Sequence, residues 1–201
     1  MSDLICSKLR RFDPALLQHW LQLPPEHAGL VVEFEDPSPL LARLRELGLW
    51  PEAMRLLAYA LPEREAVWWS CMCVRHTATT LAEPENAAVE AAEDWVRGPG
   101  PRTRQEAAMA ASAAGYAAPG SWSALGATWS HREQFMADLC GGRGAAMAVT
   151  RAAGRHRPDP EALAERFSRF FDSGVEIGNG GAGRLPAADA VSEVVAAEIV
   201  A

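Results

Sequence analysis

The stretch that decides the fold spans residues 61–77 and reads Leu61-Pro-Glu-Arg-Glu-Ala-Val-Trp-Trp-Ser-Cys-Met-Cys-Val-Arg-His-Thr77. Pro62 suits the first turn of a helix, where a missing N–H costs nothing. Two glutamates follow it, and Arg75 and His76 lie near the other end, which is the charge order that the helix dipole favours. Polarity and capping therefore predict a helix from about Pro62 to Thr77.

The predicted helix is apolar nearly all round. At about 100° per residue, one face carries small and medium side chains, namely Ala66, Val67, Ser70, Cys71, Cys73 and Val74. The other face carries Arg64, Glu65, Trp68, Trp69, Met72, Arg75 and His76. A helix of this kind is normally buried between neighbours, with its tryptophans as packing mass. The alternative is a partner or ligand groove floored by Trp68, Met72 and Trp69.

Outward from this helix, the pattern is helical almost throughout. Asp13-Pro14, Ser38-Pro39 and Asp159-Pro160 are typical of helix starts, and Gly48 and Gly115 of helix ends. Residues 29–34 form the only strand-like run, and Gly141-Gly142 predicts an interruption. The fold class expected is all-α, a compact irregular bundle of about seven to nine short helices partly stacked as helical hairpins. No fixed repeat period is present.

The same pattern predicts how the chain is organised. Residues 1–177 are expected to form a single helical domain, 178–185 a flexible glycine-rich loop and 186–201 a tail helix. That tail has Val191, Val194, Val195 and Ile199 on a partly shared face, with acidic residues outside it. Such a short helix is marginal alone in water. We therefore hypothesise a detachable element for oligomer or partner contact, with plain docking on the core as the alternative.

Two motifs resemble an uncharacterised family of bacterial all-helical proteins of about this length. One is Leu61-Pro62-x-Arg64-Glu65-Ala66-Val67-Trp68-Trp69. The other is Arg166-Phe167-x-Arg169-Phe170-Phe171-x-x-Gly174-Val175-Glu176-Ile177, which resembles that family's closing helix. The resemblance covers most of the chain and implies an all-helical fold without assigned catalytic residues. Some relatives are encoded near secretion machinery, which implies an accessory or adaptor role.

Composition excludes several classes of protein. The net charge of −7 argues against nonspecific nucleic-acid binding, which needs clustered positive charge. The beginning of the chain lacks the apolar core of a secretory signal, and no run approaches a membrane span, so we expect a cytoplasmic protein that binds no membrane. Charge is uneven, because arginines outnumber acids between residues 143 and 169. This local basic patch is either a contact for an acidic partner or a solvated helix face.

No motif indicates a metal or a cofactor. Cys71 and Cys73 point about 200° apart on a helix, so they can neither form a disulfide with each other nor hold one metal ion, and buried free thiols are expected. The histidines form no metal pattern. Gly178-x-Gly180-x-x-Gly183 matches a dinucleotide fingerprint in letters, but it follows a helical pattern rather than a strand. The sequence therefore predicts no cofactor.

The function these observations favour is a non-enzymatic protein-interaction module, that is an adaptor, chaperone or accessory subunit, with a protein partner and a homo-oligomer as a further hypothesis. The partner or ligand surface expected consists of Arg64, Glu65, Trp68, Met72 and His76. The alternative is an enzyme or small-ligand-binding protein with its site near the same residues. Because a charge inside an apolar helix needs a partner, we also expect Arg64 to pair with Glu46, Glu52 or Asp94.

Overall fold

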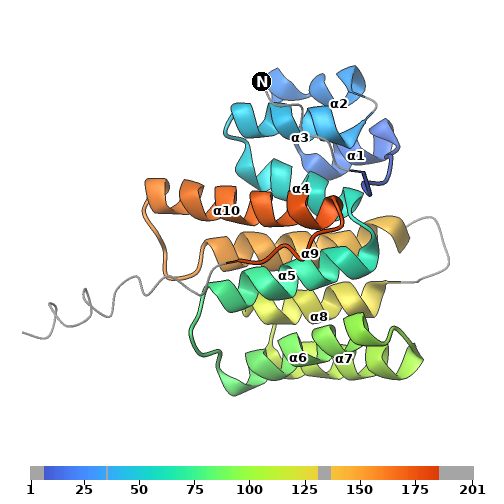
Figure 1. The fold of residues 1–201 in the computed structure, drawn as a ribbon, viewed down its shortest axis with the longest axis vertical. Coiled ribbons are helices and arrows are strands. Elements are labelled where there is room, and N and C mark those ends of the chain that lie inside the picture. Colours follow the sequence, from blue (N-terminus) through green and yellow to red (C-terminus); the bar gives the residue numbers. More distant parts are fainter. Residues whose placement is uncertain (1–6, 35, 131–136, 186–201) are drawn as a thin grey trace, which may run out of the picture.

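A computed structural model describes residues 7–34, 36–130 and 137–185. Within these ranges the chain forms ten α-helices and one short 3-10 helix, with no strand (Figure 1), which confirms the all-α class. In chain order they are α1 (Pro14–Leu21), η1 (Pro25–His27), α2 (Leu30–Glu33), α3 (Pro37–Glu46), α4 (Trp50–Ala60), α5 (Glu63–His76), α6 (Glu83–Arg97), α7 (Pro101–Ala114), α8 (Pro119–Trp129), α9 (Ala137–Ala153) and α10 (Pro160–Gly178). The strand-like pattern of residues 29–34 does not produce a strand. Because no partner strand lies beside it in the described ranges, this backbone forms its own hydrogen bonds as α2.

The helices lie in layers stacked along the long axis of the molecule (Figure 1). The first three helices form one end, and α6 and α7 form the other. Consecutive helices pair as the hairpins α3–α4, α6–α7 and α8–α9, which confirms the partly hairpin-built bundle. One cluster of buried hydrophobic residues extends from Phe12 to Ile177. No helix in the described ranges has the length and hydropathy to cross a membrane.

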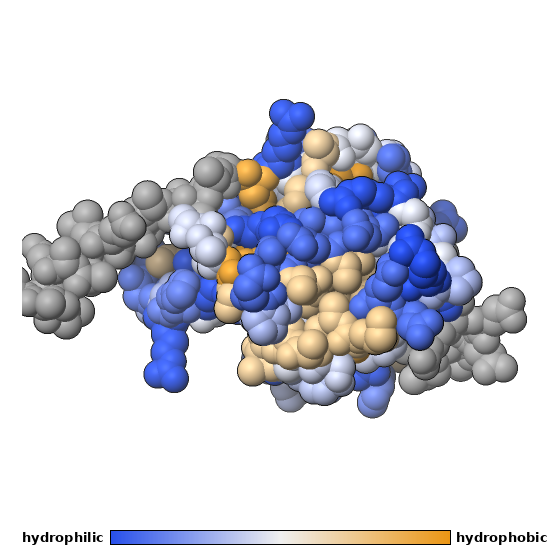
Figure 2. Space-filling view, turned by 90° about the horizontal axis from the view of Figure 1, so that it is seen from below, coloured by the Kyte–Doolittle hydropathy of each residue, from blue (hydrophilic) through white to orange (hydrophobic). Residues whose placement is uncertain are grey.

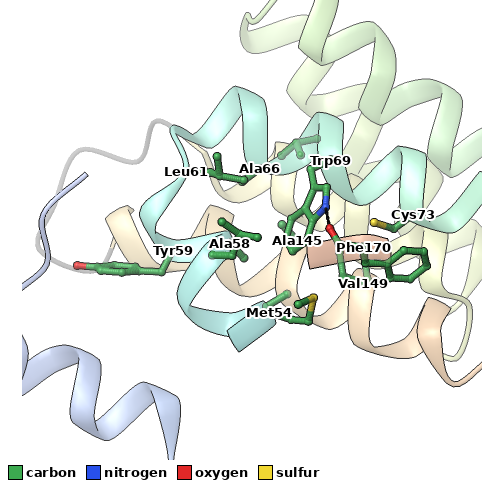
Figure 3. Packing of buried hydrophobic residues seen from close by; sticks show 14 of the residues in the cluster. Met54, Ala58, Tyr59, Leu61, Ala66, Trp69, Cys73, Ala145, Val149 and Phe170 are labelled. Atoms are coloured by element: carbon green, nitrogen blue, oxygen red, sulfur yellow. Dashed lines mark hydrogen bonds between the residues drawn. The ribbon is translucent and has the colours of Figure 1, made fainter. Parts of the chain in front are cut away.

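Helix α5 lies inside this stack, within one residue of its predicted ends. Trp69 is fully buried, and its indole Nε1 donates a hydrogen bond of 3.0 Å to the carbonyl of Phe170 on α10 (Figure 3). A side chain at Gly174 of α10 would lie 3.0 Å from the Trp69 ring, so this glycine makes room for the indole. The prediction that the tryptophans supply packing mass is confirmed for Trp69.

The predicted helix starts hold at two of three positions. The carboxylates of Asp13 and Asp159 cap α1 and α10, each just before a proline. The Ser38 start is wrong, because α3 begins one proline earlier and Asp36 accepts the hydrogen bond from the Ser38 N–H. Gly48 follows the end of α3 with a φ of 69°, a conformation that L side chains rarely adopt.

The predicted interruption at Gly141-Gly142 is wrong, because α9 continues through both residues. These glycines allow close packing instead of ending the helix. A Cβ at Gly142 would lie 2.9 Å from the carbonyl oxygen of Ala58 in α4. A Cβ at Gly144 would lie 2.5 Å from the backbone nitrogen of Gly126 in α8. Tertiary contact therefore outweighs the weak helix propensity of glycine here.

Hydrogen bonds to the backbone hold the end of α10 and part of the glycine-rich loop that follows it. Ser173 Oγ donates to the carbonyl of Gly183 at 2.6 Å, and the Lys8 N–H donates to the carbonyl of Gly178 at 2.9 Å. Gly183 is buried. The flexibility of residues 178–185 stays a prediction, and the predicted tail helix 186–201 lies outside the described residues.

Candidate interaction surface

Helices α8 and α9 meet in a close backbone contact. Besides the 2.5 Å approach of a Cβ at Gly144 to Gly126 N, a Cβ at Gly126 would lie 3.2 Å from the carbonyl oxygen of Gly141. The two backbones are therefore in direct contact, with no side chain between them at this point. Side chains that flank the contact on either helix are consequently brought onto one continuous surface.

On α8 the flanking side chains are aromatic and apolar. Trp122, Leu125 and Trp129 are spaced by three and four residues and are all half-buried. This spacing places them on one side of the helix. The Trp122 ring centroid lies 6.3 Å from that of Trp129 and 6.3 Å from that of Tyr116, in tilted and edge-on geometries that aromatic pairs favour. Tyr116 is 56% exposed.

Trp122 is held in place on two sides. Its indole Nε1 donates a hydrogen bond of 2.9 Å to the carbonyl of Tyr116. The Arg151 guanidinium of α9 lies 5.6 Å from the Trp122 ring centroid, which is within the range of a cation–π contact. A ring that is already oriented loses little side-chain entropy when something binds to it. The surface is therefore preorganised for contact.

On α9 the flanking side chains are arginines and a methionine. Arg143, Met147 and Arg151 follow each other at four-residue intervals, and all three are exposed, Met147 at 37%. We call the surface formed by these seven residues the aromatic–arginine surface (Tyr116, Trp122, Leu125, Trp129, Arg143, Met147 and Arg151). Neighbouring residues 107–130 carry no charge, and residues 139–157 contain arginines but no Asp or Glu. The surface is thus positive on a chain whose net charge is −7.

The surface predicted from the sequence lies on α5 and is only partly assembled. Arg64 is exposed, and Glu65, Trp68 and Met72 are half-buried on the outer side of that helix. His76 does not join them, because it is 8% exposed and packs edge-on against the Phe170 ring, with centroids 5.8 Å apart. Trp69 and His76 are buried since α10 covers this side of α5, which a helical wheel does not show.

The predicted pairing of Arg64 is wrong. Its premise was burial, and Arg64 is exposed, so solvent can screen its charge. The three carboxylates that were expected to pair with it contact other arginines: Glu46 pairs with Arg43, Glu52 with Arg55 and Asp94 with Arg97.

The thiols of α5 are buried and neutral. Burial, followed by the charge of Glu93, raises the pKa of Cys71 from 9.0 to about 12. Burial also raises the pKa of Cys73 well above its ordinary value. Both are free cysteines, as predicted. Since the thiolate is the reactive form, neither is suited to nucleophilic catalysis. Nearby, the hydroxyls of Ser70 and Ser123 lie 2.9 Å apart and join α5 to α8.

Two partly buried ion pairs connect helices. Arg75 of α5 contacts both carboxylate oxygens of Glu93 on α6, at 2.6 and 3.0 Å, and this contact raises the arginine pKa. Glu85 of α6 accepts hydrogen bonds from Arg155 at 2.5 Å and from the Gly120 N–H at 2.9 Å. Each carboxylate is engaged by fixed donors. These pairs therefore stabilise the junctions of α5, α6, α8 and α9.

Another apolar area lies at the end of the molecule formed by α6 and α7, where Figure 2 shows mildly hydrophobic residues between hydrophilic ones. On α7, Met109 is 59% exposed, but its neighbours are mostly alanines. An open hollow of about 300 Å³ nearby is lined by Pro101, Arg104, Gln105, Ala108 and Thr128. These residues provide no acid–base pair. Alanines also offer less contact area than the aromatic rings of the aromatic–arginine surface.

No group of three or more His, Cys, Asp or Glu side chains in the described ranges could hold a metal ion. Within those described ranges the structure shows a helical bundle with one preorganised aromatic surface. The chain belongs to DUF6931, a family of unknown function, which matches residues 40–178. No curated protein matches the chain, and no solved structure matches it. The matched range includes the whole of α5, α8 and α9, and all seven residues of the aromatic–arginine surface.

Sequence reasoning missed the aromatic–arginine surface as a whole although two signals for it were present. Trp122 and Trp129 are seven residues apart, which is close to two helical turns, so both must point the same way. Arg143 and Arg151 belong to the predicted basic patch, but their place beside Trp122 could not be seen, because Gly141-Gly142 was interpreted as a break where α9 continues.

Proposed function

We propose that this protein is a non-enzymatic interaction module, an adaptor or accessory subunit, which binds a protein partner through the aromatic–arginine surface. The observation that carries the proposal is the set of preoriented rings of Tyr116, Trp122 and Trp129 with Arg151 beside them. Tryptophan, tyrosine and arginine are the residues enriched at the energetic centres of protein interfaces. Apolar and aromatic residues gathered on one exposed face also mark interaction sites.

Two finer statements belong to the same proposal. The resemblance of the Trp–Trp motif to relatives encoded near secretion machinery supports an accessory role in a bacterial secretion apparatus. The buried free thiols Cys71 and Cys73 suit a reducing compartment, which supports a cytoplasmic location as part of the proposal. The enzyme alternative near Arg64, Glu65, Trp68 and His76 has less support, because His76 is turned into the core.

The proposal is tested by comparative affinity capture from the native organism with mass spectrometry. The bait is the full chain, and the probe variant is Trp122→Ala/Trp129→Ala. The matched control is Trp68→Ala, which removes another half-buried tryptophan, on α5. Circular dichroism confirms that each bait is folded. We expect one protein to be recovered with wild type and control, and at least about tenfold less with the probe variant, because truncation of a hot-spot tryptophan costs about 2 kcal/mol or more.

Equal recovery with all three baits would remove the aromatic–arginine surface from the proposal. Loss with Trp68→Ala alone would move the partner site to the surface first predicted on α5. The secretion link is tested by the identity of the captured protein: a component of a secretion apparatus supports it, and an unrelated protein that depends on Trp122 leaves an adaptor without that link.

A further inference from the structure

We propose that residues 186–201 of the chain dock on its own aromatic–arginine surface. The first argument is charge. This segment contains Asp189, Glu193 and Glu198 and no Lys or Arg. The surface offers the exposed guanidinium groups of Arg143 and Arg151, and neither residues 107–130 nor residues 139–157 contain an Asp or Glu. Docking would therefore bring opposite charges together on a chain that is acidic overall.

The second argument is apolar complementarity. Residues 186–201 carry Val191, Val194, Val195 and Ile199 among their acidic residues. The surface likewise has Trp122, Leu125, Trp129 and Met147 running beside the arginines. Burial of aliphatic side chains against these rings removes apolar area from water at about 25 cal/mol per Å². An isolated helix of this length gains too little by itself to be stable in water, so the segment needs a surface on which to dock.

The third argument is reach. The described chain ends at Leu185, on the side of the molecule where α9 ends and α10 begins (Figure 1). Arg151 stands in the last turn of α9. The sixteen residues from 186 to 201 span about 24 Å as a helix and about 50 Å when extended. The eleven-residue α8 is about 16 Å long, so the segment is long enough to lie along its aromatic side.

Docking of this segment gives the surface a built-in competitor. A protein partner must displace residues 186–201 before it contacts Trp122 and Trp129, so the segment lowers the apparent affinity for that partner. This regulatory consequence rests on the proposed function, whereas the docking itself does not.

The test is NMR spectroscopy of the full chain, observing the indole Nε1–H signals of its seven tryptophans. Single Trp→Phe variants assign the signals. The probe variant is Asp189→Asn/Glu193→Gln/Glu198→Gln, which removes the charge of the segment. The control is Glu26→Gln/Glu33→Gln/Glu46→Gln, which removes as many exposed charges from η1, α2 and α3. We expect the probe variant to shift the signals of Trp122 and Trp129 and to leave Trp69 unchanged.

Salt gives an independent readout. Molar NaCl shortens the Debye length to about 3 Å, so in the wild type it should move the same two signals in the same direction. Signals of Trp122 and Trp129 that respond to neither treatment, or equally to the control variant, overturn the proposal. Shifts that vanish on dilution show docking on a second copy and overturn docking within one chain.

The two proposals fail in different ways. Unmoved indole signals together with capture that depends on Trp122 remove only the docking inference. Shifted indole signals with capture that ignores Trp122 retain the docking and remove the proposed function. If both hold, the charge-neutralised variant should recover more partner than the wild type.

Discussion

Helices α5 and α8 each carry two tryptophans, and the members of the first pair separate whereas those of the second stay together. Trp68 and Trp69 are adjacent, so they point about 100° apart; one is fully buried and the other half-buried. Trp122 and Trp129 are seven residues apart and point the same way, with centroids 6.3 Å from each other at the surface. Spacing, more than aromatic content, thus decides whether tryptophans build the core or a surface.

The indole N–H groups of Trp69 and Trp122 also differ in where they find their hydrogen-bond acceptors. On α5, the indole Nε1 of Trp69 is satisfied by a carbonyl of α10, one hundred and one residues away. On α8, that of Trp122 is satisfied by the carbonyl of Tyr116, six residues away. The first hydrogen bond ties the ring into the tertiary structure. The second fixes the ring locally and leaves it only half-buried.

The largest effect expected is at Trp69. Trp69→Ala removes a fully buried indole and leaves the Phe170 carbonyl without its donor, so the free energy of unfolding should fall by about 3–5 kcal/mol. Trp68→Ala is the matched control on the same helix and should cost less than half as much. Urea unfolding of both variants measures the difference. Equal losses would show that α10 does not distinguish the two rings.

Next in size is Gly144, which brings α8 and α9 together. Gly144→Ala would place a Cβ 2.5 Å from the backbone nitrogen of Gly126, and backbone cannot move aside as a side chain can. We expect a loss of about 1–3 kcal/mol, as for overpacked cores. Gly154→Ala, where the nearest atoms would be 3.8 Å away, is the control and should be nearly neutral. Similar stabilities for both variants would contradict the backbone contact.

The glycines of α9 mark the limit of what the sequence could predict about the fold. The helix starts at Asp13 and Asp159 and the bounds of α5 follow from local rules, because capping and helical spacing act within a few residues. The continuity of α9 through Gly141 does not follow from them, since a glycine pair in a sequence is compatible both with a helix break and with a close contact between helices. Only the presence of α8 and α4 beside it selects the contact.

The buried thiols of α5 predict a pH dependence. The folded-state pKa of Cys71 is raised from 9.0 to about 12, so the folded state holds this proton more tightly than the unfolded state does. The stabilisation is fully present below pH 9 and is lost as the pH rises toward 12. Between these values, the thiol should lower the free energy of unfolding by about 1.4 kcal/mol per pH unit.

The measurement compares wild type with Cys71→Ala in urea from pH 7 to pH 10.5. The difference between their unfolding free energies should be constant up to about pH 8.5 and then shrink, because only the wild type carries the thiol. Parallel curves over the whole range would mean that Cys71 is not buried as described. Trp122→Ala keeps Cys71, so the difference in unfolding free energy between wild type and that variant should stay constant over the same range.

The candidate site was less accessible from the sequence than the fold. The wheel of α5 placed Arg64, Trp68 and Met72 on an outer face correctly, but it put His76 there as well, because it could not include α10. The aromatic side of α8 was visible as a spacing. Its arginines come from α9, and their position depends on the Gly126–Gly144 contact. A site made by two helices requires their packing to be known first.

The smallest effect expected is at Arg151, and it tests the difference between the tryptophans of α5 and α8 most directly. The side chain is exposed and lies 5.6 Å from the Trp122 centroid, so Arg151→Gln should lower the free energy of unfolding by only about 0.5–1 kcal/mol. Arg143→Gln, an exposed arginine two turns earlier on α9, is the control. A double-mutant cycle with Trp122→Ala isolates the pair, and its coupling energy should account for most of the loss. A loss as large as that of Gly144→Ala would make Arg151 part of the scaffold, whereas a small loss combined with weaker partner capture assigns it to the surface.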